Sequence, residues 1–220
     1  MKRKFLTLIL ALISAAGIAG TAPDLRPGDL LFVASGESDF SRAIVASTQT
    51  ASGLEFVHVG MIAGKGEGGE GDWNVVEASP ESGVRAVSLS QFLDESPHID
   101  GKPAVMAKRL TTEFPVAEAI DRAMEHLGQP YDWYYLPDNG MTYCSELIYE
   151  SYLDGDGNPI FETYPMNFRD ADGNMPDFWT KLFRGIGTEV PEGTPGTNPN
   201  RLSQDERLTT VWSFISDAAN

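Results

Sequence analysis

The sequence has little of several residue types on which protein chemistry often depends. Of its 220 residues, one is a cysteine, Cys144, and three are histidines. A single cysteine cannot form an internal disulfide. The chain also lacks an H-E-x-x-H motif and any cluster of cysteines and histidines, which excludes the usual zinc sites. It has 16 basic against 32 acidic residues, a net charge of -16, and this balance excludes a typical phosphate-binding surface. We therefore expect no metal, no cofactor and no nucleic-acid partner.

The remaining composition is that of a globular protein. Hydrophobic residues make up 41% and charged residues 22%, which is enough apolar material for a core. The first residues differ from the rest: Lys2, Arg3 and Lys4 precede the apolar run FLTLILALISAAGIAG, and small residues follow around 19–22. This pattern predicts a cleaved signal peptide over residues 1–22, with a retained membrane anchor as the alternative. We expect an exported protein, periplasmic or secreted, without a stable membrane anchor after cleavage.

Hydrophobic periodicity predicts about five short strands and three helices in an α+β arrangement. The expected strands lie in 26–33, 56–64, 73–79, 84–88 and 103–110, and the expected helices begin near Ser38, Glu113 and Cys144. The glycine-rich segment 64–72 predicts a hairpin loop between the second and third strands. From about Asp154 the chain is rich in turn residues. We interpret it as a loop-rich extension of one domain spanning residues 23–220.

Two stretches of this extension, DGDGN at 154–158 and DADGN at 170–174, alternate oxygen-bearing side chains as calcium loops do. Neither continues as such a loop requires. The sixth position holds Pro159 or Met175 in place of glycine, and the twelfth holds Pro165 or Lys181 in place of glutamate. Turn chemistry is the better interpretation of both stretches.

Cys144 begins a predicted helix in which Leu147, Ile148, Ser151 and Tyr152 share an inward face, while Glu146 and Glu150 face solvent. At a helix start, free backbone N–H groups and the helix dipole favour a thiolate, which is a good nucleophile. The same N–H groups can bind an oxyanion. The alternative is a buried cysteine that acts as a small hydrophobic residue.

One histidine and one glutamate interrupt apolar strands. His58 lies in FVHVGMI and Glu77 in NVVEAS, and antiparallel pairing across the glycine-rich turn would bring the two strands together. A carboxylate beside an imidazole fixes its tautomer, as in a catalytic triad. Alternation leaves open whether both side chains share a face. His98 and His126 have no such setting, and we expect structural roles for them.

Five motifs in order, GDLLF, HVGMI, VVEAS, GQPYDWYY and YCSEL, give the chain a clear resemblance over residues 24–152. It resembles the YiiX/YebB-like group of NlpC-type cysteine hydrolases, which have a circularly permuted papain-like fold. The resemblance implies an antiparallel sheet packed against the helix that carries the cysteine. It also implies that Cys144 is the nucleophile, His58 the general base and Glu77 the residue that orients it. Tyr131 matches the family's tyrosine before the cysteine and would help to bind the oxyanion.

The substrate is not fixed by the resemblance. NlpC-type enzymes mostly cleave amide bonds in cell-wall peptides, so a peptide-like substrate and a thioester acyl-enzyme are expected. Permuted relatives include lipid acyltransferases and phospholipases, which carry NCEHF where this chain has YCSEL. A lipid-directed thiol enzyme therefore remains an alternative. A third possibility is a groove-binding protein with an inert Cys144.

Overall fold

The structure is a computed structural model, and it describes residues 24–48, 53–66 and 72–215. The predicted signal peptide, residues 1–22, lies outside the described residues. Within the described ranges, no helix combines the length and apolar character needed to cross a membrane. The tip of the predicted glycine-rich hairpin, residues 67–71, is also outside them.

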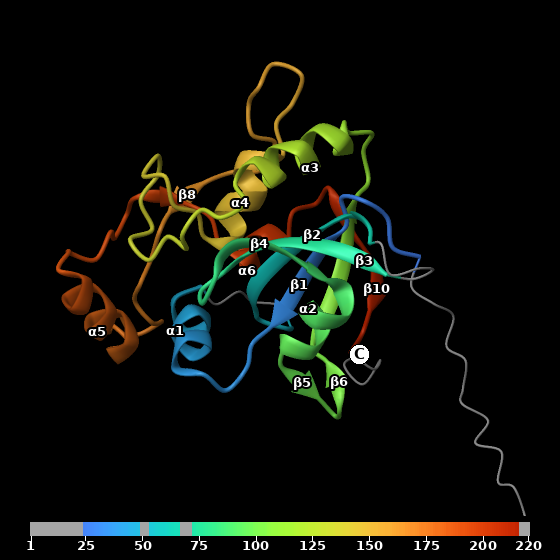
Figure 1. The fold of residues 1–220 in the computed structure, drawn as a ribbon. Coiled ribbons are helices and arrows are strands. Elements are labelled where there is room, and N and C mark those ends of the chain that lie inside the picture. The colour runs from blue at the N-terminus through green and yellow to red at the C-terminus, as the bar shows by residue number, and fades with distance from the viewer. Residues whose placement is uncertain (1–23, 49–52, 67–71, 216–220) are drawn as a thin grey trace, which may run out of the picture.

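The fold is built on a six-stranded antiparallel sheet (Figure 1). Its strands in chain order are β1 (Leu30–Ala34), β2 (Phe56–Lys65), β3 (Trp73–Ser79), β4 (Gly83–Ser88), β7 (Val105–Leu110) and β10 (Leu208–Ser213). Across the sheet they run β10-β7-β1-β2-β3-β4. Two short antiparallel pairs lie outside it: β5 (His98–Ile99) with β6 (Lys102–Pro103), and β8 (Tyr164–Pro165) with β9 (Pro195–Gly196).

Helices cover both faces of the sheet (Figure 1). They are α1 (Asp39–Thr48), α2 (Leu89–Glu95), α3 (Val116–Glu125), α4 (Cys144–Ser151), α5 (Asp177–Ile186) and α6 (Pro199–Ser203). α3 and α4 pack on one face and α2 on the other, because side chains alternate along each strand and both sets are apolar. Ser38, near which the first helix was expected to begin, caps α1: its hydroxyl accepts a hydrogen bond from the Ser41 N–H at 3.0 Å.

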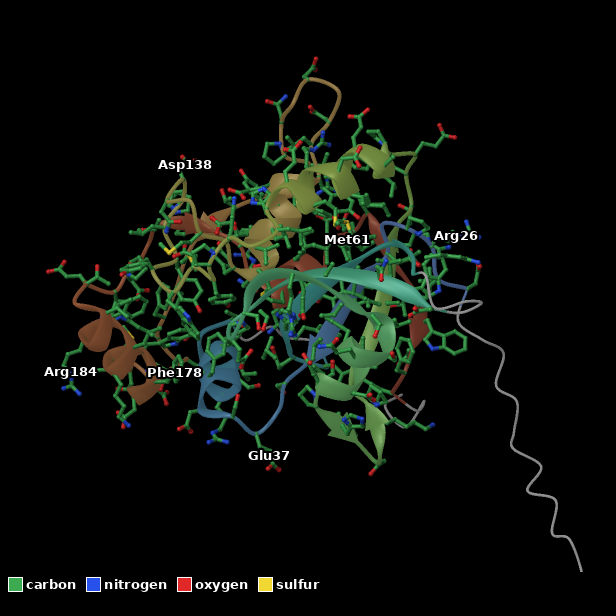
Figure 2. The ribbon with its side chains drawn as sticks, viewed as in Figure 1. Arg26, Glu37, Met61, Asp138, Phe178 and Arg184 are labelled. Carbon is green, nitrogen blue, oxygen red and sulfur yellow. The ribbon has the colours of Figure 1, made fainter. Side chains whose placement is uncertain are left out.

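Two hydrophobic clusters occupy the two faces. The α4 side contains Phe32, Val59, Met61, Leu147 and Ile148. The α2 side contains Leu31, Ile62, Val75, Val87 and Phe92. Met61, near the centre of Figure 2, is fully buried. The predicted α+β architecture, with an antiparallel sheet against the helix of Cys144, is the observed one.

The region after Asp154 contains more regular structure than its turn-rich sequence suggests. It forms α5, α6 and β10, and β10 pairs with β7 at the edge of the main sheet. β10 is hard to detect in the sequence because Leu208 is its only buried residue. This is typical of an edge strand, which makes few core contacts. α5 buries Trp179 and Phe183, one turn apart, near α1 (Figure 1). Phe178 of the same helix stacks on Phe40 of α1, with ring centroids 5.2 Å apart (Figure 2).

The two oxygen-rich stretches form the same turn twice. The Asp154 Oδ1 atom accepts the N–H groups of Asp156 and Asn158, each at 2.9 Å. The Asp170 Oδ1 atom accepts those of Asp172 and Asn174, at 3.0 and 2.7 Å. In each turn the aspartate thus binds its own backbone, which is the turn chemistry expected of Asx residues.

Candidate active site

Cys144 is the first residue of α4, and it is 3% exposed. Tyr143 is the N-cap, and its N–H donates to the Glu146 carboxylate at 3.4 Å, which closes a capping box. The thiol therefore lies in the first turn, among N–H groups that have no partner within the helix. These groups and the helix dipole favour a negative charge at this point.

His58 and Glu77 are in direct contact. The His58 Nε2 and Glu77 Oε2 atoms are 2.5 Å apart. The register explains the contact, since Glu77 on β3 lies opposite Gly60 on β2. His58 is two residues from Gly60 and so shares its face of the sheet. The two side chains are diagonal neighbours on that face, which sequence alternation alone could not establish.

Arg85 is a third member of this cluster that was not anticipated from the sequence. It lies directly opposite Glu77 on β4. Its Nε and Nη2 atoms donate to Glu77 Oε1 at 2.9 and 2.7 Å, and Nη2 also donates to Glu95 of α2 at 2.5 Å. A signal was available in the strand GVRAVS, where an arginine interrupts apolar residues one short turn after Glu77.

The charges of this cluster support one another. Burial alone would lower the pKa of His58, but hydrogen bonds to the side chains of Cys144 and Glu77, with their negative charges, outweigh it and raise that pKa to about 10. Burial would raise the pKa of Glu77, yet contacts with His58 and Arg85 lower it overall. At neutral pH the imidazole is therefore protonated and the Glu77 carboxylate is ionised.

Gly60 leaves room for the aromatic ring that packs beside the imidazole. A Cβ atom at residue 60 would lie 2.9 Å from Val75 Cγ1 and 3.0 Å from Phe92 Cε2. Phe92 in turn stacks near His58, with ring centroids 6.0 Å apart and an interplanar angle of 29°. The glycine thus permits the close packing that fixes the imidazole plane.

Tyr131, predicted to lie by the cysteine, is buried there at 7% exposure and packs on Trp133. Burial raises its pKa well above the usual value, and the charges of Tyr135 and Cys144 raise it further. The phenol therefore stays neutral and can donate a hydrogen bond.

Tyr135 lies close enough to be affected by both Tyr131 and Cys144. Its buried hydroxyl has no well-aligned partner among the described residues, and its φ of 54° is unusual for a non-glycine residue.

A groove of about 1050 Å³ opens beside His58, Glu77 and Tyr131. Its other lining side chains come mainly from the segment that includes α1 and from the region of α2 and β5. Apolar lining residues include Val33, Phe40, Ile44, Val57, Phe92 and Ile99, and acidic ones include Glu37, Glu81 and Glu95. Glu37 lies on the loop that precedes α1 (Figure 2). The volume is that of a site for a small molecule or a short chain segment.

The other predicted positions lie as follows. His126 contacts Gln129 at 3.0 Å and Thr142 at 3.3 Å, so it ties α3 to the loop before α4. His98 lines the groove, and its Nδ1 lies 2.9 Å from the Ser96 carbonyl oxygen. Glu146 was predicted to face solvent, and this is wrong: it is 7% exposed. Its reach back to the N-cap turns it inward, where burial and the Glu150 charge raise its pKa to about 8.

No group of three or more histidine, cysteine, aspartate or glutamate side chains is arranged to hold a metal ion within the described ranges. The cluster around Cys144 consists of one thiol, one imidazole, one carboxylate and one guanidinium. A thiol with an imidazole and an orienting carboxylate can attack a carbonyl carbon and pass through a covalent acyl intermediate.

Comparisons with known proteins identify the family and the fold. Residues 24–212 match the model of the permuted papain-like amidases of the YaeF/YiiX, C92 family. The protein YiiX of Escherichia coli K12 is 25% identical over 215 residues, which cover 95% of this chain and 97% of YiiX. A crystal structure of the metalloprotein YiiX from Escherichia coli O157:H7 has the same fold, with a TM-score of 0.65 and 24% identity. That match covers 87% of this chain and 98% of the other. The predicted family resemblance and permuted papain-like fold are thereby confirmed.

Proposed function

The chain belongs to the YaeF/YiiX, C92 family of permuted papain-like amidases, and on that premise we propose that it is an exported cysteine amidase acting on peptide-like substrates of the cell envelope. The observation that carries the proposal is the chain of contacts from Glu77 through His58 to Cys144 at a helix start. The basic and apolar first residues support export to the periplasm or beyond.

In the proposed reaction, Cys144 and protonated His58 form an ion pair, and the sulfur attacks the amide carbonyl carbon. The oxyanion is held by backbone N–H groups at the start of α4 and by the Tyr131 hydroxyl. His58 gives its proton to the leaving nitrogen as the C–N bond breaks, which leaves a thioester on Cys144. Water then attacks the thioester while His58 accepts its proton, and the acid product leaves with the thiol restored. Glu77, held by Arg85, keeps the imidazole oriented throughout.

The groove favours a peptide-like chain over a charged lipid. Its apolar residues can bury side chains or the stem of a linker, and Glu37, Glu81 and Glu95 place carboxylates along it. Arg85 also lines the groove, but Glu77 and Glu95 already engage it. A phosphate headgroup would therefore meet an excess of carboxylates, whereas a neutral or amine-bearing peptide would not be repelled. The same apolar lining, with Phe40, Val57 and Phe92, is the observation that keeps a lipid-directed thiol acyltransferase or phospholipase as the second candidate.

A substrate panel tests both functions. The purified protein is incubated with envelope-type peptides, a neutral acyl amide and phospholipid vesicles, and the products are identified by mass spectrometry. Release of an amine from the peptides, absent in Cys144→Ala, supports the amidase. Release of a fatty acid or acyl transfer from the vesicles, with the peptides intact, supports the lipid enzyme. Full turnover of any substrate by Cys144→Ala would end both thiol mechanisms.

A further inference from the structure

A short segment late in the chain touches both elements that carry the proposed chemistry. Residues 197–200, here called the clamp segment, run from the end of β9 into α6. On one side the segment binds residues that flank Cys144, and on the other it binds the start of the strand that carries His58. It contributes no group to the attack itself. Two of its residues, Thr197 and Asn200, contact the supports of the reacting groups.

On the cysteine side, Thr197 bonds to both neighbours of the nucleophile. Its N–H donates to the Tyr143 Oη atom at 3.0 Å, and its hydroxyl donates to the Ser145 Oγ atom at 2.9 Å. Thr197, Tyr143 and Ser145 are 5%, 4% and 0% exposed. Hydrogen bonds between buried groups hold geometry well, because no water can replace them.

Close backbone packing holds Thr197 in this place. The preceding residue, Gly196, pairs with Tyr164 between β9 and β8. A Cβ atom at residue 196 would lie 2.4 Å from Met166 Sδ and 3.0 Å from Tyr143 Oη. A larger residue here would have to displace the Met166 side chain or move away from the Tyr143 hydroxyl, so glycine suits this close approach.

On the histidine side, Asn200 bonds to the first residue of β2. Its Oδ1 atom accepts the Phe56 N–H at 2.8 Å, two residues before His58, and Asn200 is 0% exposed. Its Nδ2 atom donates to the Thr48 carbonyl oxygen at 3.1 Å. Between the two contact points, the Asn198 side chain caps α6 by accepting the Arg201 N–H at 2.8 Å. The segment is thus internally ordered as well as attached at both ends.

We propose that residues 197–200 form a positioning clamp that fixes the Cys144 thiol relative to the His58 imidazole, an inference that rests on the proposed function. The two groups lie on elements far apart in the sequence, α4 and β2. Catalysis by a thiol and an imidazole depends on their separation, and a displacement of about 1 Å costs on the order of a hundredfold in rate. Thr197 sets the position of the sulfur, and Asn200 sets that of the strand.

The test measures the rate at which iodoacetamide labels Cys144 from pH 5 to 9, which requires no knowledge of the substrate. Thr197→Val keeps the side-chain shape and removes the hydroxyl. We expect it to lower the labelling rate at pH 6 about tenfold, since the thiol is no longer aligned with the imidazole. Thr197→Ser should restore the rate. Tyr143→Phe removes the hydroxyl that accepts the Thr197 N–H, on the other neighbour of Cys144. It should have a similar effect on the labelling rate even if Thr197→Val fails to fold.

The matched control is Ser151→Ala, which removes another buried hydroxyl from α4, one bonded to the Leu147 carbonyl oxygen at 2.6 Å. It should lower the melting temperature while the labelling profile stays that of the wild type. Wild-type labelling profiles in both Thr197→Val and Tyr143→Phe would overturn the clamp. The proposed function fails in a different way: the wild type itself would then label slowly at pH 6, at the same rate as His58→Ala.

Discussion

Two buried carboxylates near Cys144 are held in opposite charge states. Glu77 on β3 faces His58 and Arg85, and these contacts lower its pKa although burial opposes them. Glu146 lies two residues after the cysteine, and its charged neighbours among the described residues are other carboxylates. Burial and the charges of Glu150 and Asp132 raise its pKa to about 8. The two residues are similarly buried, at 4% and 7% exposure.

The difference shows that the charged and hydrogen-bonding groups around a buried carboxylate determine its charge more than its degree of burial does. On the sheet side, opposite charges alternate from the His58 imidazole to the Glu77 carboxylate and the Arg85 guanidinium. On the helix side, a carboxyl group closes a capping box and is neutral below its raised pKa. Only the first arrangement suits charge-separating chemistry, and the predictions below test each side of the contrast.

The largest effect on turnover should come from removing the His58 imidazole, one of the two cations that face Glu77. His58→Gln leaves Cys144 without a proton acceptor and donor, and we expect kcat/KM on the peptide substrate to fall on the order of a thousandfold. The measurement is steady-state turnover together with Cys144 labelling at pH 6. His98→Gln, in the same groove but without a carboxylate partner, is the control and should stay near wild type. Rapid labelling in His58→Gln would contradict the proposed pairing.

Neutralising the Glu77 carboxylate should reduce turnover less than removing His58 does. Glu77→Gln keeps the shape but loses a charge-assisted hydrogen bond to the imidazole, which is worth about 1.5–3 kcal/mol. Turnover should therefore fall about 10- to 100-fold. Glu95→Gln removes the other partner of Arg85 without touching His58, so its kcat and its rate of Cys144 labelling at pH 6 should change little. Equal losses in the two variants would mean that Glu77 acts only through the arginine.

The pH dependence of stability should separate the groups. The pKa of His58 is about 10 in the folded protein against an ordinary 6.5, so its contribution is full below 6.5 and is lost as the pH rises through 10. Glu77, whose folded pKa is lowered from 4.5, contributes above 4.5 and its contribution is lost as the pH falls. Urea unfolding at pH 4, 6, 8 and 10 measures this. In His58→Gln the fall between pH 6.5 and 10 should largely disappear, and an unchanged fall would disprove the assignment.

The smallest effect on turnover should come from substituting Glu146, whose titration affects the stability of the protein. Its folded pKa of about 8 lies above the ordinary 4.5, so the folded state holds the proton more tightly and stability falls as the pH rises from 4.5 to 8. Glu146→Gln can still accept the Tyr143 N–H and close the capping box. We expect it to raise the free energy of unfolding at pH 9, by about 1.4 kcal/mol for each unit by which the folded pKa is raised, and to leave it unchanged at pH 4. Glu118→Gln, on the surface of α3, serves as the control. Lower stability of Glu146→Gln at pH 9 would contradict this, because it would show that the charged carboxylate is favourable in the folded protein.

The sequence supported most of the elements and the proposed site, for reasons visible in particular residues. His58, Glu77 and Cys144 stand out because each is a reactive group in an apolar or helix-start setting. Their contact could not be derived from alternation, since it depends on a register that places Gly60 opposite Glu77.

Arg85 and Thr197 were missed for a similar reason, although the arginine itself stands out in its apolar strand. Nothing in an isolated strand says that its arginine will meet a carboxylate on the next strand. Thr197 lies in a run of glycine, proline and asparagine whose local pattern predicts only turns. Its partners, Tyr143 and Ser145, lie more than fifty residues away in the sequence. Long-range contacts of this kind follow from the fold and not from any local periodicity.

The clamp segment also has a consequence for the order in which this protein is made. During synthesis His58 and Glu77 emerge first and Cys144 later, but the bond between Phe56 and Asn200 spans 144 residues. Closing so distant a contact is slow and depends on nearly the whole chain being present. A nascent or truncated product that stops before residue 197 contains every proposed catalytic side chain without the segment that aligns them. If the clamp aligns the thiol as proposed, the protein becomes reactive only after the last part of the chain has folded onto the rest.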